Sequence, residues 1–183
     1  MRAIILAAGV GSRLRPLTDT LPKCLVPVGG RPVLGWQTAA LRAAGVDDIT
    51  VVAGYRAPQV SAFCAGQDGD VRVVVNEVFD RTNNMFSLRL ALGGHEREDT
   101  LICNGDVVFD AAIVAAMLAE PDRNLIAVEP GRYIAESMKV TVGENGRITG
   151  LSKAIPAEDA FGVSIDLYQF TGHAVSAICR VAD

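Results

Sequence analysis

Short apolar runs alternate with stretches of helical spacing over the first 130 residues of the chain. The runs are rich in Val, Ile and Leu, as is typical of buried strands, and they cover residues 2–6, 49–53, 71–75, 100–103 and 124–128. The stretches between them predict helices at 32–44, 57–65, 83–92 and 111–119. Strands that alternate with helices predict an α/β domain with a mostly parallel sheet. Ligands of such sheets bind at the carboxyl ends of the strands.

The pattern changes near residue 131. Residues 138–142, 147–151 and 161–170 predict further strands, and Glu144-Asn145-Gly146 predicts a hairpin turn between the first two. A last helix is expected to start at His173. We therefore predict one domain over residues 1–183, with a core at 1–130 and a β-rich extension at 131–183 that covers the active edge of the sheet.

Composition limits the classes of function that the chain can have. Half of the residues are apolar and 21% are charged, which indicates a folded, water-soluble protein. The net charge of −4 gives no general attraction to nucleic acid or to an anionic membrane, so we expect neither as a partner. The longest early apolar run is too short to span a bilayer. Four widely spaced cysteines without a Cys-x-x-Cys pair predict reduced thiols in a cytoplasmic protein.

The loop after the first predicted strand combines glycines with basic side chains. Gly9 and Gly11 let the backbone turn sharply and approach a ligand closely. Successive backbone N–H groups in such a turn bind anions, and positive charge is added by Arg13, Arg15 and Lys23. The loop is not a Walker motif, which needs Gly-Lys-Ser/Thr, nor a dinucleotide fingerprint, because Leu14 stands where a third glycine is needed. It predicts a polyphosphate site of another kind.

A second polar turn, Asn104-Gly105-Asp106, directly follows the fourth predicted strand. This position exposes a carboxylate at the carboxyl edge of the sheet. Mg²⁺ prefers oxygen ligands and uses one or two carboxylates together with substrate phosphates. Asp106 is therefore our candidate metal ligand, whereas Asp110 is placed to cap the helix that follows it.

The segment L-A-A-G-V-G-S-R-L-R-P-L-T…P-K, which runs from Leu6 to Lys23, resembles the signature of a nucleotidyltransferase family. The enzymes of this family join a nucleoside monophosphate to a phosphorylated small molecule, and their pattern is matched here at every position. Asn104-Gly105-Asp106 is similar to a second element of the family. The resemblance implies a Rossmann-like three-layer α/β/α fold, a sugar-phosphate nucleotidylyltransferase type of reaction, and Mg²⁺ as cofactor.

The reaction that the resemblance implies needs cations more than a general base. The attacking phosphate already carries about −1.5 to −2 charges near neutral pH, so the difficulty lies in bringing two polyanions together. By resemblance, Arg13 contacts the triphosphate and Lys23 bridges the α-phosphate and the incoming phosphate. Neither His95 nor His173 lies beside a plausible nucleophile. The nucleotide is expected to contact Leu6, Ala7, Ala8, Gly9, Gly11, Ser12, Arg13, Asn104 and Gly105.

A cluster of amides favours one branch of the family. The string Thr-Asn-Asn-x-x-Ser, which starts at Thr82, resembles the cytidylyltransferases that act on phosphocholine, and related branches that act on phosphonates or inositol phosphate. Amide side chains can read the edge of a base through paired donors and acceptors. We therefore expect CTP rather than UTP or dTTP, with the base near Asn76, Asn83, Asn84 and Ser87, although adjacent asparagines at a helix start can also be simple caps.

The acceptor side is less well defined. Lys139 and Lys153 are candidates to hold the acceptor phosphate, with solvated strand lysines as the alternative. An acceptor that carries an ammonium group would need an aromatic or acidic pocket, for which the candidates are Glu129, Tyr133, Phe161 and Tyr168. Phosphocholine is the leading acceptor.

One departure from the family concerns the second metal ligand. The family usually runs some tens of residues longer and takes a second aspartate from a late strand. Asp166 is the nearest late carboxylate here, and no motif assigns it that role. Either the extension is truncated at its C-terminus, or the second carboxylate is supplied differently, or the protein is impaired. The alternatives to a cytidylyltransferase are thus a sugar-1-phosphate nucleotidylyltransferase that uses dTTP, UTP or GTP and a non-catalytic nucleotide-binding module.

Overall fold

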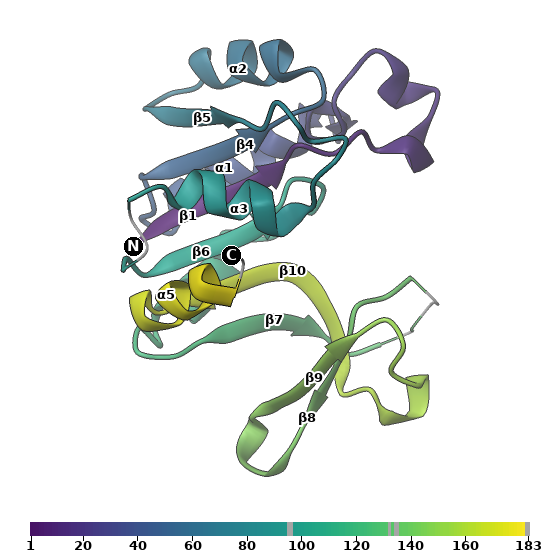
Figure 1. The fold of residues 1–183 in the computed structure, drawn as a ribbon, viewed down its shortest axis with the longest axis vertical. Coiled ribbons are helices and arrows are strands. Elements are labelled where there is room, and N and C mark those ends of the chain that lie inside the picture. Colours follow the sequence, from purple (N-terminus) through teal and green to yellow (C-terminus); the bar gives the residue numbers. More distant parts are fainter. Residues whose placement is uncertain (95–96, 132, 134–135, 182–183) are drawn as a thin grey trace. The chain divides into compact units, whose positions relative to one another are not determined.

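The computed structural model describes residues 1–94, 97–131, 133 and 136–181, and its chain forms two compact units (Figure 1). The core unit consists of Met1–Leu125 and Tyr168–Asp183, and the β-rich unit consists of Ile126–Leu167. None of the described helices is long and apolar enough to cross a membrane.

Four parallel strands form the centre of the core unit. They are β1 (Arg2–Ala7), β4 (Ile49–Ala53), β5 (Val71–Val75) and β6 (Thr100–Asn104), and their order in the sheet is β5-β4-β1-β6. Central β1 and β4 are buried along almost their whole length, as their uninterrupted apolar sequences predict. The sequence thus predicted these strands correctly, to within one residue.

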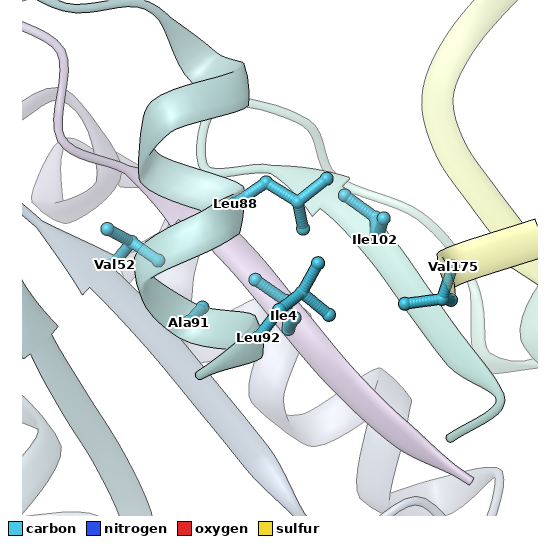
Figure 2. Close-up of a cluster of buried hydrophobic side chains, with 7 residues drawn as sticks. All are labelled: Ile4, Val52, Leu88, Ala91, Leu92, Ile102 and Val175. Atoms are coloured by element: carbon cyan, nitrogen blue, oxygen red, sulfur yellow. The ribbon is translucent and has the colours of Figure 1, made fainter. Parts of the chain in front are cut away.

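Helices cover both faces of this sheet. On one face α3 (Asn84–Leu92) and α5 (Gly172–Val181) pack on the strands, and Figure 2 shows their shared cluster, which consists of Ile4, Val52, Leu88, Ala91, Leu92, Ile102 and Val175. The opposite face holds α1 (Val33–Ala43), which contacts α4 (Ala111–Leu118). The remaining helix, α2 (Ala57–Ala65), packs against β4 and β5. The predicted three-layer α/β/α fold is therefore confirmed.

The β-rich unit is built on antiparallel pairs. Strand β8 (Lys139–Val142) pairs with β9 (Ile148–Ser152) and with β10 (Gly162–Phe170), and β7 (Leu125–Glu129) also pairs with β10. The turn between β8 and β9 places Asn145 at φ 69° and Gly146 at φ 70°. These left-handed conformations suit Asn and Gly, so the hairpin predicted at residues 144–146 is present.

Two features differ from the expectations. The core was expected to end at residue 130, but Tyr168–Asp183 also belongs to it, because Val175 of α5 packs among strand and α3 side chains. A small hairpin of β2 (Pro27–Val28) and β3 (Arg31–Pro32) precedes α1, so the helix expected from residue 32 starts at Val33. Strands of two residues are too short to leave an apolar pattern.

Candidate active site

A cavity of about 180 Å³ lies at the carboxyl ends of β1 and β6, where the sequence placed the ligand site. Except for Cys24, all of its lining residues were among the predicted site residues. They are Leu6, Ala7, Gly9, Gly11, Lys23, Cys24, Asn84, Asn104, Gly105 and Asp106. The cavity lies within the core unit.

The glycine loop forms one wall of the cavity. Gly11 has φ 68°, and a Cβ added there would lie 2.9 Å from the Cβ of Lys23, so glycine is needed both for the turn and for the lysine beside it. The side-chain oxygen of Thr18 donates to the carbonyl oxygen of Gly11 at 2.9 Å and closes the loop. A Cβ added at Gly9 would have no neighbour within 4 Å. Gly9 therefore faces open space in which a ligand could approach the backbone.

The opposite wall is the turn at the end of β6. The backbone N–H of Gly105 donates to the carbonyl oxygen of Leu6 at 2.8 Å. A Cβ added at Gly105 would lie 2.7 Å from the Cβ of Ala7. Glycine is thus required for the ends of β1 and β6 to lie this close, and the turn directs Asp106 into the cavity.

Lys23 and Asp106 meet across the cavity. The ammonium group of Lys23 donates to a carboxylate oxygen of Asp106, and the two side chains are 36% and 33% exposed. The chain thereby brings the predicted cation and the predicted metal ligand, 83 positions apart, into direct contact. Both groups remain open to solvent and to an incoming ligand.

The two adjacent asparagines have different roles in the structure. Asn83 caps α3, since its side chain accepts from the backbone N–H groups of Met85 and Phe86. Asn84 lines the cavity, and its amide donates to the side-chain oxygen of Asn104 at 3.3 Å. The capping alternative is therefore correct for Asn83, and Asn84 is the amide that is available to a ligand.

Asn76 and Ser87 are buried away from the cavity lining, contrary to their expected place near the base. The amide of Asn76 donates to Thr82 Oγ1 at 3.0 Å and to Ser87 Oγ at 3.1 Å, and its oxygen accepts from the N–H of Val78. Both protons of this amide are used inside the protein. Asn76 thus ties the loop after β5 to α3.

Three other predicted residues of the glycine loop do not line the cavity. Ser12 and Arg13 lie on the exposed short turn at Ser12–Leu14. Ala8 is almost buried, and its carbonyl oxygen accepts from the N–H of Tyr55 at 2.9 Å. Ala8 therefore joins the glycine loop to the end of β4.

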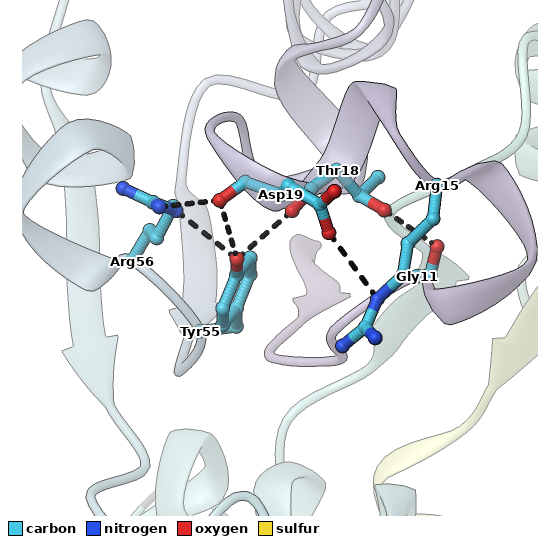
Figure 3. Close-up of polar contacts among 6 residues, drawn as sticks. All are labelled: Gly11, Arg15, Thr18, Asp19, Tyr55 and Arg56. Atoms are coloured by element: carbon cyan, nitrogen blue, oxygen red, sulfur yellow. Dashed lines mark hydrogen bonds and ion pairs between the residues drawn. The ribbon is translucent and has the colours of Figure 1, made fainter.

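A set of donors from the segment after β4 holds the part of the glycine loop at residues 18–20, and Figure 3 shows two of them, Tyr55 and Arg56. The hydroxyl of Tyr55 donates to the carbonyl oxygen of Thr18 at 2.9 Å, and the guanidinium of Arg56 donates to the main-chain carbonyl oxygen of Asp19. Gln59 donates to the carbonyl oxygen of Thr20 at 3.1 Å. We call Tyr55, Arg56 and Gln59 the loop clamp. It holds three successive carbonyl groups.

Of the residues predicted for the acceptor, Tyr168 belongs to the core unit and the others lie in the β-rich unit. The amine of Lys139 is buried and donates to the carbonyl oxygen of Lys153 at 2.7 Å, so this lysine is neither solvated nor free to bind a phosphate. Lys153 is exposed and pairs with Glu136 at 3.0 Å. Tyr133 donates to the carbonyl oxygen of Ala160 at 3.4 Å, and Glu129 is exposed at the end of β7.

The described residues offer a magnesium ion a single carboxylate in the cavity. No group of three or more His, Cys, Asp or Glu side chains that could hold a metal occurs among them. This donor set nevertheless fits Mg²⁺, which completes its shell with water and substrate phosphates. Asp166, the late carboxylate considered as a second ligand, lies on β10 in the β-rich unit.

Among the described residues, thiols and histidines supply no nucleophile to the site. Burial raises the pKa of Cys24, which lines the cavity, to about 12. Burial and the neighbouring charge of Asp106 raise the pKa of Cys103 to about 12 as well. Both thiols are thus protonated at neutral pH. His173 is exposed on α5, and His95 lies outside the described residues.

The sequence did not identify the residues that lie outside the cavity but bind the main chain of its walls. Gln37 of α1 donates to the carbonyl oxygen of Asn104 at 2.7 Å, and Tyr55 holds the glycine loop. Gln37 had one signal, a polar residue on the apolar face of a predicted helix. Tyr55 had none, because its partners are main-chain atoms.

Comparison with known proteins places this arrangement in a family. The model of the MobA-like NTP transferase domain matches residues 3–137. A CTP:phosphoglutamine cytidylyltransferase from Campylobacter jejuni is 30% identical to the chain over 196 residues, covering 97% of the chain and 76% of that protein. A CMP-5'-(3-aminopropyl)phosphonate synthase from Streptomyces rubellomurinus is 36% identical over 129 residues, covering 69% of the chain but only 20% of that protein.

A solved structure shows the same fold. The CTP:phosphocholine cytidylyltransferase from Streptococcus pneumoniae matches with a TM-score of 0.77 at 24% identity, covering 100% of this chain and 75% of that one. The chain therefore belongs to the MobA-like NTP transferase family of nucleotidyltransferases, and cytidylyltransferases are among its homologues.

Proposed function

We propose that the protein transfers CMP from CTP to a phosphorylated or phosphonylated small molecule and releases pyrophosphate. An oxygen of the acceptor forms a bond to the α-phosphorus of CTP, and the bond from that phosphorus to the bridging oxygen of pyrophosphate breaks. The observation that carries this proposal is the meeting of Lys23 and Asp106 beside the glycine loop. A cation and a carboxylate at one cavity suit the joining of two polyanions.

Lys23 and Arg13 are the proposed catalytic residues. Lys23 lies between the glycine-loop wall and the Asp106 wall, so its ammonium can neutralise the charge that gathers as the two phosphates approach. Arg13 is exposed beside the loop and would contact the triphosphate. The open backbone at Gly9 would allow the phosphates to come close.

Asp106 is the proposed ligand of a Mg²⁺ ion. When bound, such an ion neutralises phosphate oxygens and orients them for in-line displacement. The protein supplies the position of the carboxylate, which Gly105 fixes against β1. Lys23 would leave Asp106 for the substrate phosphates, because its contact with the carboxylate is partly exposed and therefore contributes only about 0–1 kcal/mol.

The choice of CTP rests on the relatives and on one amide. The curated relatives described above are named for CTP or CMP, and the Thr82-Asn83-Asn84 string resembles the same branch. Asn84 is the cavity-lining amide of that string and is our candidate to contact the nucleotide. None of the four cysteines forms a disulfide in the described part of the chain, which agrees with an enzyme of the cytoplasm.

The proposed acceptor carries a nitrogen-containing group besides its phosphorus. Phosphoglutamine, aminopropylphosphonate and phosphocholine, which the relatives' names specify, share this chemistry. Phosphocholine remains the leading acceptor. Glu129 and Tyr133 are candidates for the ammonium end, and exposed Lys153 is the remaining candidate for the phosphate, since the amine of Lys139 is already bound by main-chain oxygens.

Pyrophosphate release with a matrix of nucleotides and acceptors tests this function. We expect release with CTP and Mg²⁺ only when a phosphocholine-like or aminoalkylphosphonate acceptor is present. Release with UTP, dTTP or GTP and a sugar 1-phosphate would instead support a sugar-1-phosphate nucleotidylyltransferase. No release from any pair, together with measurable CTP binding, would support a non-catalytic nucleotide-binding module.

A further inference from the structure

A buried glutamine lies directly behind the turn that carries Asp106. Gln37 is 0% exposed on α1, and its amide nitrogen donates to the carbonyl oxygen of Asn104 at 2.7 Å. Because a carbonyl oxygen can only accept, the NH₂ end of the Gln37 amide must face Asn104. The other end of the amide, Oε1, is buried and has no hydrogen-bond partner among the described residues.

Stability alone does not explain a glutamine at this position. A buried polar atom without a hydrogen bond costs roughly 1–3 kcal/mol. An apolar side chain of similar shape would avoid that penalty at Oε1 while filling the same space under the sheet. The gain from Gln37 must then come from its NH₂ group, which makes a weak contact with the sulfur of Cys103 at 4.0 Å and one strong bond, to the carbonyl oxygen of Asn104 at 2.7 Å.

That bond fixes one particular peptide group. The carbonyl of Asn104 and the N–H of Gly105 belong to the same planar unit, and the N–H donates to the carbonyl oxygen of Leu6 at 2.8 Å. Gln37 thus holds one end of the peptide plane and β1 holds the other. The next residue along the chain is Asp106, so the orientation of this peptide plane determines the direction in which the Asp106 side chain points.

We propose that Gln37 is a positioning residue for the reaction, which aims the Asp106 carboxylate by holding the Asn104–Gly105 peptide. This inference rests on the proposed function, in which Asp106 binds the metal ion that accompanies CTP. Gln37 itself touches neither substrate nor metal. It acts through the backbone, as hydrogen-bond partners behind metal ligands commonly do.

The chain contains a matched control for this glutamine. Gln169 of β10 is 1% exposed, donates to the carbonyl oxygens of Glu120 at 2.8 Å and Arg123 at 3.3 Å, and also has a buried Oε1 without a partner among the described residues. Both partners follow α4, and neither is part of the cavity. The variants Gln37→Met and Gln169→Met therefore each remove a buried amide that makes one short bond to a main-chain carbonyl and one longer bond.

The experiment compares these two variants with the parent protein in three measurements: Tm, pyrophosphate release, and the additional rise in Tm that Mg²⁺ produces when CTP is present. We expect similar Tm values for both variants without ligand. We expect Gln37→Met alone to lose about 10- to 100-fold in turnover and most of the Mg²⁺-dependent rise in Tm. Equal activity and equal Mg²⁺ response in both variants would overturn the proposal.

A second variant keeps the test informative if Gln37→Met does not fold. Gln37→Glu keeps the shape of the side chain, and its carboxyl group can donate to Asn104 only while it is protonated. Its turnover relative to the parent should fall as the pH rises, measured where circular dichroism shows it to be folded. A constant ratio over the pH range in which it is folded would contradict the proposed role.

The failure of this inference differs from the failure of the proposed function. If Asp106→Asn abolishes Mg²⁺-dependent release while Gln37→Met behaves like Gln169→Met, only the role of Gln37 is wrong. If Asp106→Asn has the parent's activity and Mg²⁺ response, the function on which the inference rests is wrong.

Discussion

At the scale of residues, the contact between Lys23 and Asp106 is the central feature of the molecule. Each side chain is about one third exposed, and partly exposed ion pairs contribute little to stability. Substituting either residue should leave the fold intact. Changes in rate can then be read as changes in the chemistry of the site, not as loss of folded protein.

Lys23→Ala should reduce turnover far more than it reduces affinity for CTP. The reason is that an ammonium between two phosphates gains most of its interaction energy when they meet, and such interactions affect kcat more than binding. Steady-state kinetics and CTP binding by calorimetry would measure the two effects. Arg123→Ala, which removes a cation of an exposed ion pair with Glu120, serves as the control. Equal losses in turnover and affinity would contradict the proposed role.

Residue types predicted the members of the site better than their roles. The sequence predicted Lys23, Asp106 and the glycines because a motif contains them, and the structure brings them to one cavity. It could not tell which of Asn83 and Asn84 caps the helix and which lines the cavity, because two adjacent side chains at a helix start point in different directions. The amide of Asn76 could read a base, but in the structure it is occupied by hydrogen bonds to Thr82 of the loop and Ser87 of α3.

At the scale of elements, the site depends on how the glycine loop is held. Its inner side packs on the stem of Lys23 and its outer side is fixed by Tyr55, Arg56 and Gln59 of the loop clamp. Two elements that are distant in the sequence therefore set the shape of one phosphate-binding loop. A loop held in advance does not lose this conformational freedom when a ligand binds.

Alanine at the two glycines of the loop should have different effects. Gly11→Ala forces a side chain into φ 68° and against Lys23, so it should reduce the free energy of unfolding by about 1–2 kcal/mol. Gly9→Ala meets no neighbour within 4 Å and should keep the parent's stability while weakening CTP binding. Urea unfolding and CTP titration of both variants provide the measurement. Normal CTP binding by Gly9→Ala would show that the ligand does not approach there.

Tyr55→Phe tests the loop clamp. The variant keeps the aromatic ring against Phe79 but loses the hydroxyl that donates to Thr18. The bond to Thr18 is worth about 1 kcal/mol, and the contacts of the hydroxyl with Asp19 and Arg56 are lost as well. We therefore expect an at least roughly fivefold higher KM for CTP, with the KM for the acceptor unchanged. An unchanged KM for CTP would mean that the loop keeps its shape without this bond.

At the scale of the whole molecule, the sequence predicted the order of the strands and helices but not the division into units. Alternating apolar runs set the α/β class, because each run had to be buried in a sheet. The return of Tyr168–Asp183 to the core unit depends on packing of Val175 with residues more than seventy positions earlier, which no local pattern contains. The acceptor-binding residues could not be ranked for the same reason.

Buried thiols should make the stability of the protein depend on alkaline pH. The pKa of Cys103 rises from 9.0 to about 12 on folding because burial disfavours the thiolate. Above pH 9 the unfolded chain releases this proton and the folded chain keeps it, so stability falls as the pH rises towards 12. Under reducing conditions, the free energy of unfolding should fall less steeply with pH in Cys103→Ala than in the parent protein. The two slopes should differ by up to roughly 1.4 kcal/mol per pH unit. Identical slopes in both proteins would contradict this explanation.

The most direct test of the whole account is Mg²⁺-dependent release of pyrophosphate from CTP by Asp106→Asn. The control is Asp110→Asn, since Asp110 lies four positions further on and caps α4 through the N–H of Ala112. With a phosphocholine-like acceptor, we expect Asp110→Asn to retain activity and Asp106→Asn to lose it at every Mg²⁺ concentration. A parental rate and a parental Mg²⁺ dependence in Asp106→Asn would contradict the account.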